Sequence, residues 1–326
     1  MVKKTALLLI AVAVAFSAFA CAPGRQNDDG KLRVVTTIFP IYDWVRSILG
    51  DDPANAEVVL LEDSGVDLHS FQPTVDDVAA IASCDVFIYV GGESDGWVPK
   101  ALQGLKNSGR TDISLLDALG ESALHEERVE GMQQESGEED GGNEGPGSDE
   151  HVWLSLRNAA YFCEYISEVI CAKDPSNREA YERNTETYVG ELKALDGEFA
   201  GAAEKIDRKV LLFADRFPFR YFTEDYGFEY YAAFPGCSAE TEASFATIVF
   251  LADKINELSL DVIFCTEGSD EALARTVRDT AKRNDLKICR LNSLQSVSAV
   301  SVREGATYLG LMRENLESLN EAFNVH

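Results

Sequence analysis

The chain has 326 residues, a formal net charge of −27 at pH 7 and 45% hydrophobic residues. So acidic a protein repels nucleic acid and anionic lipid and concentrates cations near its surface, which argues against a nucleic-acid partner. Acidity also maintains solubility, so charge alone assigns no function. The roughly 300 residues beyond the N-terminal segment are enough for two lobes rather than one.

Residues 1–20 have the features of a secretory signal. Lys3 and Lys4 precede an apolar stretch that ends in small residues before Cys21. The stretch is shorter than the roughly 20 apolar residues of a membrane-spanning helix. The run ending in cysteine resembles the bacterial lipoprotein signal, which implies cleavage before Cys21 and lipid attachment to its sulfur; a plain secretory signal is the alternative. Residues 21–31 then form a tether that holds a soluble body near the membrane.

From residue 32 onward, short apolar runs alternate with helical patterns. The runs predict eight strands, at 32–38, 56–61, 84–90, 112–117, 209–214, 228–234, 260–265 and 286–291. Segments 73–83, 244–258 and 269–284 show helical spacing of apolar residues and begin with Thr or Ser capping candidates. Such alternation predicts an α/β protein with parallel sheets covered by helices on both faces.

Four predicted strands lie on each side of a central segment, so we expect two α/β lobes, each with a parallel four-stranded sheet. We assign residues 32–173 to the N-terminal lobe and 208–326 to the C-terminal lobe. The segment between them, 174–207, begins with the helix start signal Asp174-Pro175-Ser176. Its apolar residues recur at threes, fours and sevens, which predicts one rigid linking helix of roughly 45 Å that limits how far the lobes open.

Residues 126–150 form a low-complexity acidic segment with ten acidic residues, one basic residue and six glycines. Since such a segment cannot bury enough apolar surface to order itself, we expect a solvated, disordered loop. A role in collecting cations for the following histidine is the alternative. The six cysteines after Cys21 match no zinc-finger, iron–sulfur or CxxC spacing. Cys265 and Cys289 end neighbouring predicted strands, and we leave open whether they pair or are core residues.

The candidate ligands are sparse and follow predicted strands or loops. His69 follows the strand 56–61, and His151 begins an apolar run directly after the acidic segment. Asp215, Glu267 and Asn292 follow the strands 209–214, 260–265 and 286–291. Because ligands of open α/β sheets bind at the carboxyl ends of the strands, we expect these side chains to face a cleft between the lobes. Imidazoles with carboxylates indicate a transition-metal site.

Five features occur in an order typical of one family: VVTTIFPIYDWVRSILGD (34–51), GVDLHSFQPT (65–74), DEHVWLS (149–155), the long central helix and the Tyr226-Gly227 pair. With these features the chain resembles the metal-binding lipoproteins of bacterial ABC importers for zinc and manganese, the cluster A-I binding proteins. The resemblance covers nearly the whole chain and implies two α/β lobes joined by a rigid helix.

The resemblance places His69 and His151 at the ligand positions of the N-terminal lobe. In the C-terminal lobe the chain departs from the family. Asp215, in FADRFPFRYF, stands where many relatives have a histidine or glutamate, and Asn292 stands where an aspartate or histidine is usual. Glu267 and Glu240 are the substitutes if the loops differ.

The resemblance further implies a lipid-anchored protein on the extracytoplasmic face of the cell membrane. It would act as a monomer, capture a divalent transition metal between its lobes and deliver it to the membrane permease of an ABC importer, with no enzymatic activity. Zinc is the expected ion, because imidazoles favour it, whereas two oxygen donors favour manganese. A manganese-binding homologue is the first alternative. A secreted zinc-dependent hydrolase is another, although HExxH is absent, and a surface adhesin is the third.

Overall fold

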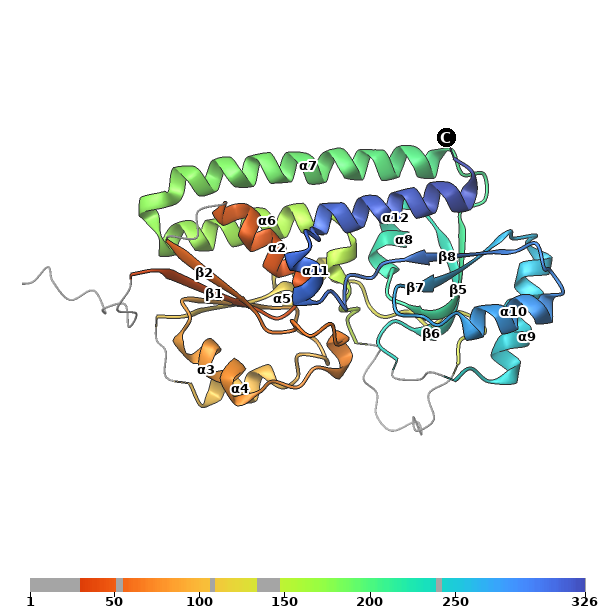
Figure 1. Ribbon diagram of the computed structural model, residues 1–326, viewed down its shortest axis with the longest axis horizontal. Helices are drawn as coiled ribbons and strands as arrows, with labels where there is room; N and C mark the ends of the chain where they lie inside the picture. The colour runs from red at the N-terminus through yellow and green to blue at the C-terminus, as the bar shows by residue number, and fades with distance from the viewer. Residues whose placement is uncertain (1–29, 51–54, 106–108, 134–146, 239–241, 326) are drawn as a thin grey trace, which may run out of the picture.

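The computed structural model describes residues 30–50, 55–105, 109–133, 147–238 and 242–325 (Figure 1). The predicted signal 1–20, the lipidation site Cys21, nearly all of the tether 21–31 and the substitute ligand Glu240 lie outside these ranges. Among the described residues, no helix combines the length and apolar character that crossing a membrane requires.

The first lobe is built on a parallel sheet with the strand order β2-β1-β3-β4. Thr36 of β1 pairs with Leu60 of β2, and Val34 of β1 pairs with Val86 of β3. Its elements, in chain order, are β1 (Leu32–Thr36), α2 (Phe39–Leu49), β2 (Ala56–Leu60), the 3₁₀ turn η1 (Leu68–Ser70), α3 (Val75–Ser83), β3 (Val86–Tyr89), α4 (Val98–Gln103), β4 (Thr111–Ser114), α5 (Leu115–Leu119), and the 3₁₀ turns η2 (Gly120–Ser122) and η3 (Val152–Leu154).

The second lobe repeats this arrangement with the strand order β6-β5-β7-β8, again all parallel. Its elements are β5 (Val210–Phe217), α8 (Arg220–Tyr226), β6 (Glu229–Pro235), α9 (Phe245–Glu257), β7 (Val262–Thr266), α10 (Ala272–Ala281), β8 (Lys287–Leu291), α11 (Ala299–Arg303) and α12 (Tyr308–Phe323). All eight predicted strands are present, and the predicted fold of two four-stranded α/β lobes is confirmed.

Two strands end three residues away from their predicted ends, while the other strand ends differ by two residues or fewer. The strand predicted at 112–117 stops at Ser114, because the Ser114 hydroxyl accepts a hydrogen bond from the Asp117 backbone N–H and caps α5. The strand predicted at 209–214 extends to Phe217, because a register shift between Phe213 and Arg216 lets β5 resume pairing with β6. Asp215 therefore lies within β5 and not in a loop after it.

The capping predictions hold for two of the three helices. Thr74 forms a capping box with Asp77 at the start of α3, and Ser244 caps α9. Ser269 does not cap α10, which begins after Glu271, a residue with φ of 62°. Instead, the Ser269 hydroxyl accepts a hydrogen bond from the Glu271 backbone N–H and shapes the turn before the helix.

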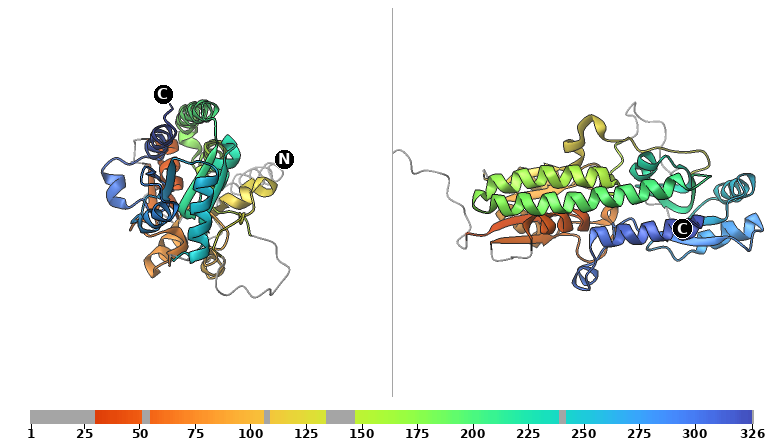
Figure 2. Two further views of the ribbon diagram at one scale, coloured as in Figure 1. Left: turned by 90° about the vertical axis from the view of Figure 1, so that its right-hand side faces the viewer. Right: turned by 90° about the horizontal axis from the view of Figure 1, so that it is seen from above.

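The predicted long helix is α7 (Arg178–Glu204), and it is about 40 Å long by helical rise. It starts four residues after the beginning of the predicted segment 174–207, because Pro175–Asn177 forms the 3₁₀ turn η4. Figure 1 shows α7 running over both lobes, and it contacts α2, α8, α12 and the preceding helix α6 (Leu156–Lys173). Figure 2 shows α6 and α7 side by side from above. The buried face of α7 carries the predicted apolar residues, among them Tyr188, Leu192 and Leu195.

The last helix, α12, connects the lobes a second time. At its first residue the backbone N–H of Tyr308 donates to the buried carboxylate of Asp43 in α2, at 2.8 Å. The Tyr308 hydroxyl donates to the backbone oxygen of Trp153, at 2.6 Å. The indole N–H of Trp153 in turn donates to the backbone oxygen of Ser293, beyond β8, at 2.8 Å. These buried hydrogen bonds hold the two lobes in one arrangement.

The ends of the predicted acidic loop are more ordered than expected. Residues 134–146 lie outside the described chain. On either side of them, the backbone N–H of Glu126 donates to the oxygen of Gly147, at 2.9 Å, and that of Asp149 donates to Leu124, at 2.8 Å. Asp149 and Glu150 are buried. The prediction of a disordered loop over 126–150 is therefore wrong for its two ends, which these contacts and the burial of Asp149 and Glu150 fix.

The six cysteines after Cys21 all lie in the described part of the chain, where all six are free thiols. Cys265 and Cys289 do not form a disulfide; the Cys265 thiol approaches the backbone oxygen of Cys289 at 3.7 Å. Cys84, Cys163, Cys171 and Cys265 are buried, as expected for small core residues.

Candidate metal site

His69 is held in the turn η1, which follows β2 of the first sheet. The carboxylate of Asp67 caps this turn by accepting the His69 backbone N–H at 3.0 Å. Leu68, 1% exposed, anchors the turn in the core of the lobe. The His69 ring Nδ1 lies 2.6 Å from the Ser94 hydroxyl. With Nδ1 bonded to Ser94 in this way, Nε2 is the ring nitrogen left to bind a metal ion.

His151 directly precedes η3, whose three residues Val152–Leu154 are all buried and fix the backbone beside the ring. The side chain of His151 is fully buried. One oxygen of the Asp149 carboxylate accepts both the His151 backbone N–H, at 2.9 Å, and the ring Nδ1, at 3.0 Å. A carboxylate on Nδ1 fixes the tautomer that leaves Nε2 free as a metal ligand and makes it more basic.

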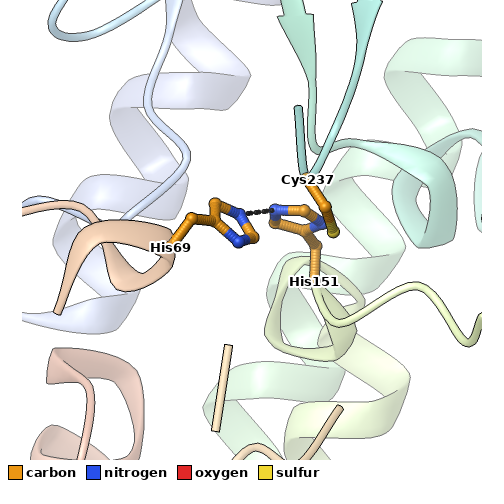
Figure 3. A group of neighbouring side chains, drawn as sticks. All are labelled: His69, His151 and Cys237. Atoms are coloured by element: carbon orange, nitrogen blue, oxygen red, sulfur yellow. Dashed lines mark hydrogen bonds between the residues drawn. The ribbon is translucent and has the colours of Figure 1, made fainter. Parts of the chain in front are cut away.

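The two Nε2 atoms face each other at 3.4 Å, with the ring planes at 58° (Figure 3). Two nitrogen ligands of one tetrahedral zinc ion are about 3.3 Å apart, given zinc–nitrogen bonds of about 2.0–2.1 Å. The predicted pair is thus brought together at a separation that suits a shared ion.

Cys237 is the third member of this group. One ligand atom each from His69, His151 and Cys237 lies within 4.8 Å of the others. Figure 3 shows Cys237 approaching the His151 ring from the opposite side to His69. It lies in the turn after β6, where Gly236 passes so near His151 that a Cβ there would be 2.9 Å from the ring. Only glycine permits this approach of the second lobe to the histidine.

The structure does not bring the three predicted ligands of the C-terminal lobe into this group. One oxygen of Asp215 accepts both the N–H and the hydroxyl of Thr266, at 3.0 and 2.8 Å, and the other accepts the Arg216 N–H. The two oxygens of Glu267 accept the N–H and hydroxyl of Ser293, both at 2.8 Å.

Asn292 has a similar structural role. Its side-chain oxygen accepts the Leu294 N–H at 2.8 Å, and its backbone exchanges hydrogen bonds with the Asn315 side chain. These contacts brace the loops at the carboxyl ends of β7 and β8. Asp215 and Glu267 nevertheless line a cavity of about 580 Å³ that also includes Asp67, beside the His69 turn.

An ion pair closes the cleft near His69. The Arg216 guanidinium, at the end of β5, lies 2.8 Å from the Asp67 carboxylate of the N-terminal lobe. Asp67 therefore caps the His69 turn through one oxygen and binds the opposite lobe through the other. The approach of the lobes and the position of His69 are coupled through this one side chain.

The surroundings shift the pKa values of the two histidines in opposite directions. Burial, together with the neighbouring His151, lowers the pKa of His69 to about 4. Burial also disfavours charge on His151, but the adjacent Asp149 carboxylate outweighs it and raises the pKa of His151. His69 is thus a neutral ligand at neutral pH, and a proton that competes with a metal binds first at His151. Burial raises the pKa of the Cys237 thiol.

Cys237 is not among the ligands predicted from the sequence, because the cysteine spacings match no metal-binding motif. The signal was present, since FEYYAAFPGC places it directly after the strand predicted at 228–234. The rule that ligands follow the carboxyl ends of strands, applied to this strand as well as to its neighbours, selects it. Asp149 was likewise counted with the acidic loop, although it is the partner of His151.

Comparison with known proteins identifies the family of the chain. Residues 34–322 match the family model described as zinc-uptake complex component A, periplasmic. The chain is 31% identical over 321 residues to the zinc-binding lipoprotein AdcA of Streptococcus pneumoniae, covering 98% of this chain but 61% of that protein. It is 29% identical to the high-affinity zinc uptake system protein ZnuA of Bacillus subtilis, over 100% of this chain and 99% of the relative.

Solved structures give the same result. The Zn(II)-bound ZnuA-like domain of Streptococcus pneumoniae AdcA superposes with a TM-score of 0.70 at 28% identity, covering 90% of this chain and all of that domain. The periplasmic zinc-binding protein TroA of Treponema pallidum gives 0.72 at 25% identity, covering 90% and 99% of the two chains. With the fold, the paired histidines and the family match over residues 34–322 in agreement, the chain belongs to the family of zinc-uptake complex component A proteins.

Proposed function

We propose that this protein captures one zinc ion between its lobes and delivers it to the membrane permease of an ABC importer. The observation that carries the proposal is the approach of His69 Nε2 and His151 Nε2 to 3.4 Å in a buried site. Each ring has a fixed partner on its other nitrogen, Ser94 or Asp149, which is the outer-shell arrangement typical of metal-bound histidine. The family match and the names of the relatives support zinc as the ion.

The burial of the site favours a carrier over an enzyme. A zinc hydrolase keeps an open coordination position that a substrate can reach. Here the His151 side chain is fully buried and that of His69 is 10% exposed, and Gly236 of the second lobe passes close to the His151 ring. We therefore propose no catalytic activity. Release of the ion then requires the loops or lobes to move apart.

His69 and His151 are the ligands on which the proposal depends. Asp215, Glu267 and Asn292 remain predictions for the rest of the coordination shell. Each would have to exchange hydrogen bonds with Thr266, Ser293 or Leu294 for a bond to the ion. The lipid anchor at Cys21, the extracytoplasmic face of the membrane and the monomeric state belong to the same proposal. The lipoprotein name of the Streptococcus pneumoniae relative supports the anchor.

Calorimetric titration tests the proposal. The chain from residue 21 onward, carrying Cys21→Ser to prevent lipidation, is stripped with chelator and titrated with zinc and with manganese. We expect zinc to bind more tightly than manganese and to raise the melting temperature. Zinc at about 1,000 times its dissociation constant adds roughly 4 kcal/mol to the free energy of unfolding.

The variant carrying both His69→Ala and His151→Ala should lose this shift. His125→Ala is the matched control, since His125 lies away from the group and contributes its backbone to a bridge with Ser148. A stripped protein that zinc does not stabilise, or an equal stabilisation of the double variant, would refute the proposal.

A further inference from the structure

The two histidines both belong to the N-terminal lobe, so a carrier that closes on its ion needs a donor from the other lobe. We propose that the Cys237 thiolate is that donor, so that the ion is bound by His69, His151 and Cys237. This inference rests on the proposed function and specifies its coordination. It also replaces the oxygen donors expected from the sequence with a sulfur.

The first support is distance. The ligand atoms of the three residues lie within 4.8 Å of one another. In a tetrahedral zinc site with a zinc–sulfur bond of about 2.3 Å, nitrogen and sulfur ligands are about 3.6 Å apart. Binding an ion therefore requires the sulfur and the rings to move closer together, which rotation of the Cys237 side chain and a shift of the turn supply.

The second support is the way the turn is held. Pro235 ends β6 in register with Phe217 of β5, which fixes the strand before the turn. The Cys237 backbone N–H donates to the Glu126 carboxylate of the first lobe, at 3.2 Å. A Cβ at position 236 would lie 2.8 Å from the backbone oxygen of Phe217. Glycine, which has no Cβ, allows this close approach. The turn is therefore fixed from both lobes, with its sulfur beside the His151 ring.

The third support is the state of the alternative donors. Asp215 and Glu267 hold their hydrogen bonds with both oxygens, and these bonds brace β5, β7 and the loop after β8. Recruiting either carboxylate breaks bonds that maintain the lobe. Coordination by Cys237 breaks none of these.

The chemistry of the step is simple. The sulfur–hydrogen bond of Cys237 breaks, the proton leaves to solvent, and the sulfur lone pair forms the bond to Zn²⁺ without any redox change. Thiolate is a soft ligand that selects zinc over manganese, which prefers carboxylate, carbonyl and water oxygens. A His₂Cys set therefore predicts a carrier more selective against manganese than one with two carboxylates would be.

The test compares Cys237→Ser with the matched control Cys289→Ser, both in the chelator-stripped chain with Cys21→Ser. Like Cys237, Cys289 is a partly exposed free thiol, but it lies in β8, outside the group of His69, His151 and Cys237. Cobalt(II) serves as the spectroscopic probe. We expect thiolate-to-cobalt charge-transfer absorption in the parent protein and in Cys289→Ser, and its loss in Cys237→Ser.

Loss of an outer-shell partner weakens metal binding by roughly 10- to 100-fold. Loss of a direct ligand should cost at least as much, so we expect the zinc dissociation constant of Cys237→Ser to rise by at least this factor. Its preference for zinc over manganese should fall. An unchanged cobalt spectrum and unchanged zinc affinity in Cys237→Ser would overturn the thiolate ligand while leaving the proposed function intact. If the stripped parent protein binds no zinc, both the function and this inference fail.

A second measurement needs no variant and so is independent of folding. The stripped protein is alkylated with iodoacetamide with and without zinc, and each cysteine is followed by mass spectrometry. We expect zinc to protect Cys237 and to leave the alkylation of Cys289 unchanged. Equal alkylation of Cys237 in both samples, under conditions where zinc binds and the metal-free protein is alkylated at Cys237, would also overturn the inference.

Discussion

Asp149 offers the sharpest test of how the second nitrogen of His151 is used. One of its oxygens accepts both the backbone N–H and the ring Nδ1 of His151, and the residue is 2% exposed. Asp149→Asn retains an oxygen acceptor and removes the charge. Asp149→Ala removes the acceptor and leaves two buried donors without it.

Loss of an outer-shell partner costs about 10- to 100-fold in metal affinity, or about 1.4–2.7 kcal/mol. We expect about tenfold weaker zinc binding for Asp149→Asn and about 100-fold for Asp149→Ala. The Ala variant should also lose about 1–3 kcal/mol of metal-free stability, because buried donors are left unpaired.

Competition against a chromophoric zinc chelator measures the affinities, and denaturant melts of the stripped proteins measure the stabilities. Asp253→Asn, on the exposed face of α9, is the control for removal of one negative charge. If Asp149→Ala binds zinc as tightly as the parent protein, the carboxylate does not support His151 as a ligand, and the reasoning is refuted.

Three further predictions concern pH and packing. Burial, with Asp95 and Asp67 nearby, raises the pKa of Glu62 to about 9, so this acid is neutral when folded but ionised when unfolded between pH 4.5 and 9. Stability should therefore fall as pH rises through that window. Glu62→Gln should remove this residue's contribution to the slope and add about 3 kcal/mol to the free energy of unfolding at pH 7 in denaturant melts. An unchanged slope would contradict this. Burial opposes charge on His151, but Asp149 raises its pKa overall, whereas His69 remains neutral down to about pH 4. Zinc affinity should therefore fall by about tenfold per pH unit below the pKa of His151. Calorimetry at stepped pH measures this fall, and a pH-independent affinity would exclude His151 as a ligand. Leu192→Ala, at a fully buried position of α7, should cost about 2–5 kcal/mol of stability by thermal melting, and a loss below 1 kcal/mol would show that α7 does not depend on this contact.

The elements were predictable because their signals are local. Each strand is a short β-branched or aromatic run, and α7 carries an apolar stripe that needs no knowledge of its partner. The positions of His69 and His151 outside the strands were equally readable. Both rest on turns anchored by adjacent buried residues, Leu68 and Val152 to Leu154, which are visible in the sequence as the apolar neighbours of each histidine.

The second half of the site was not predictable in this way. Asp215 was predicted to follow a strand, but the register shift in β5 places it within the strand, with both carboxylate oxygens hydrogen-bonded. A shift of this kind depends on the neighbouring strand β6 and leaves no periodic trace. Asn292 was selected by its position after β8, yet it braces its own turn.

The sequence by itself determined the two α/β lobes, the helix that joins them and the two histidines of the first lobe. Only the tertiary structure decided what faces those histidines. Asp149 was part of an acidic segment until the chain buried it against His151, and Cys237 was one of several small cysteines until the turn after β6 crossed between the lobes. Periodicity records which face of an element is buried. It does not record which loops meet, because that depends on strand order and on how the two lobes approach each other. His69 and Cys237, which meet in this way, are more than 160 residues apart in the chain.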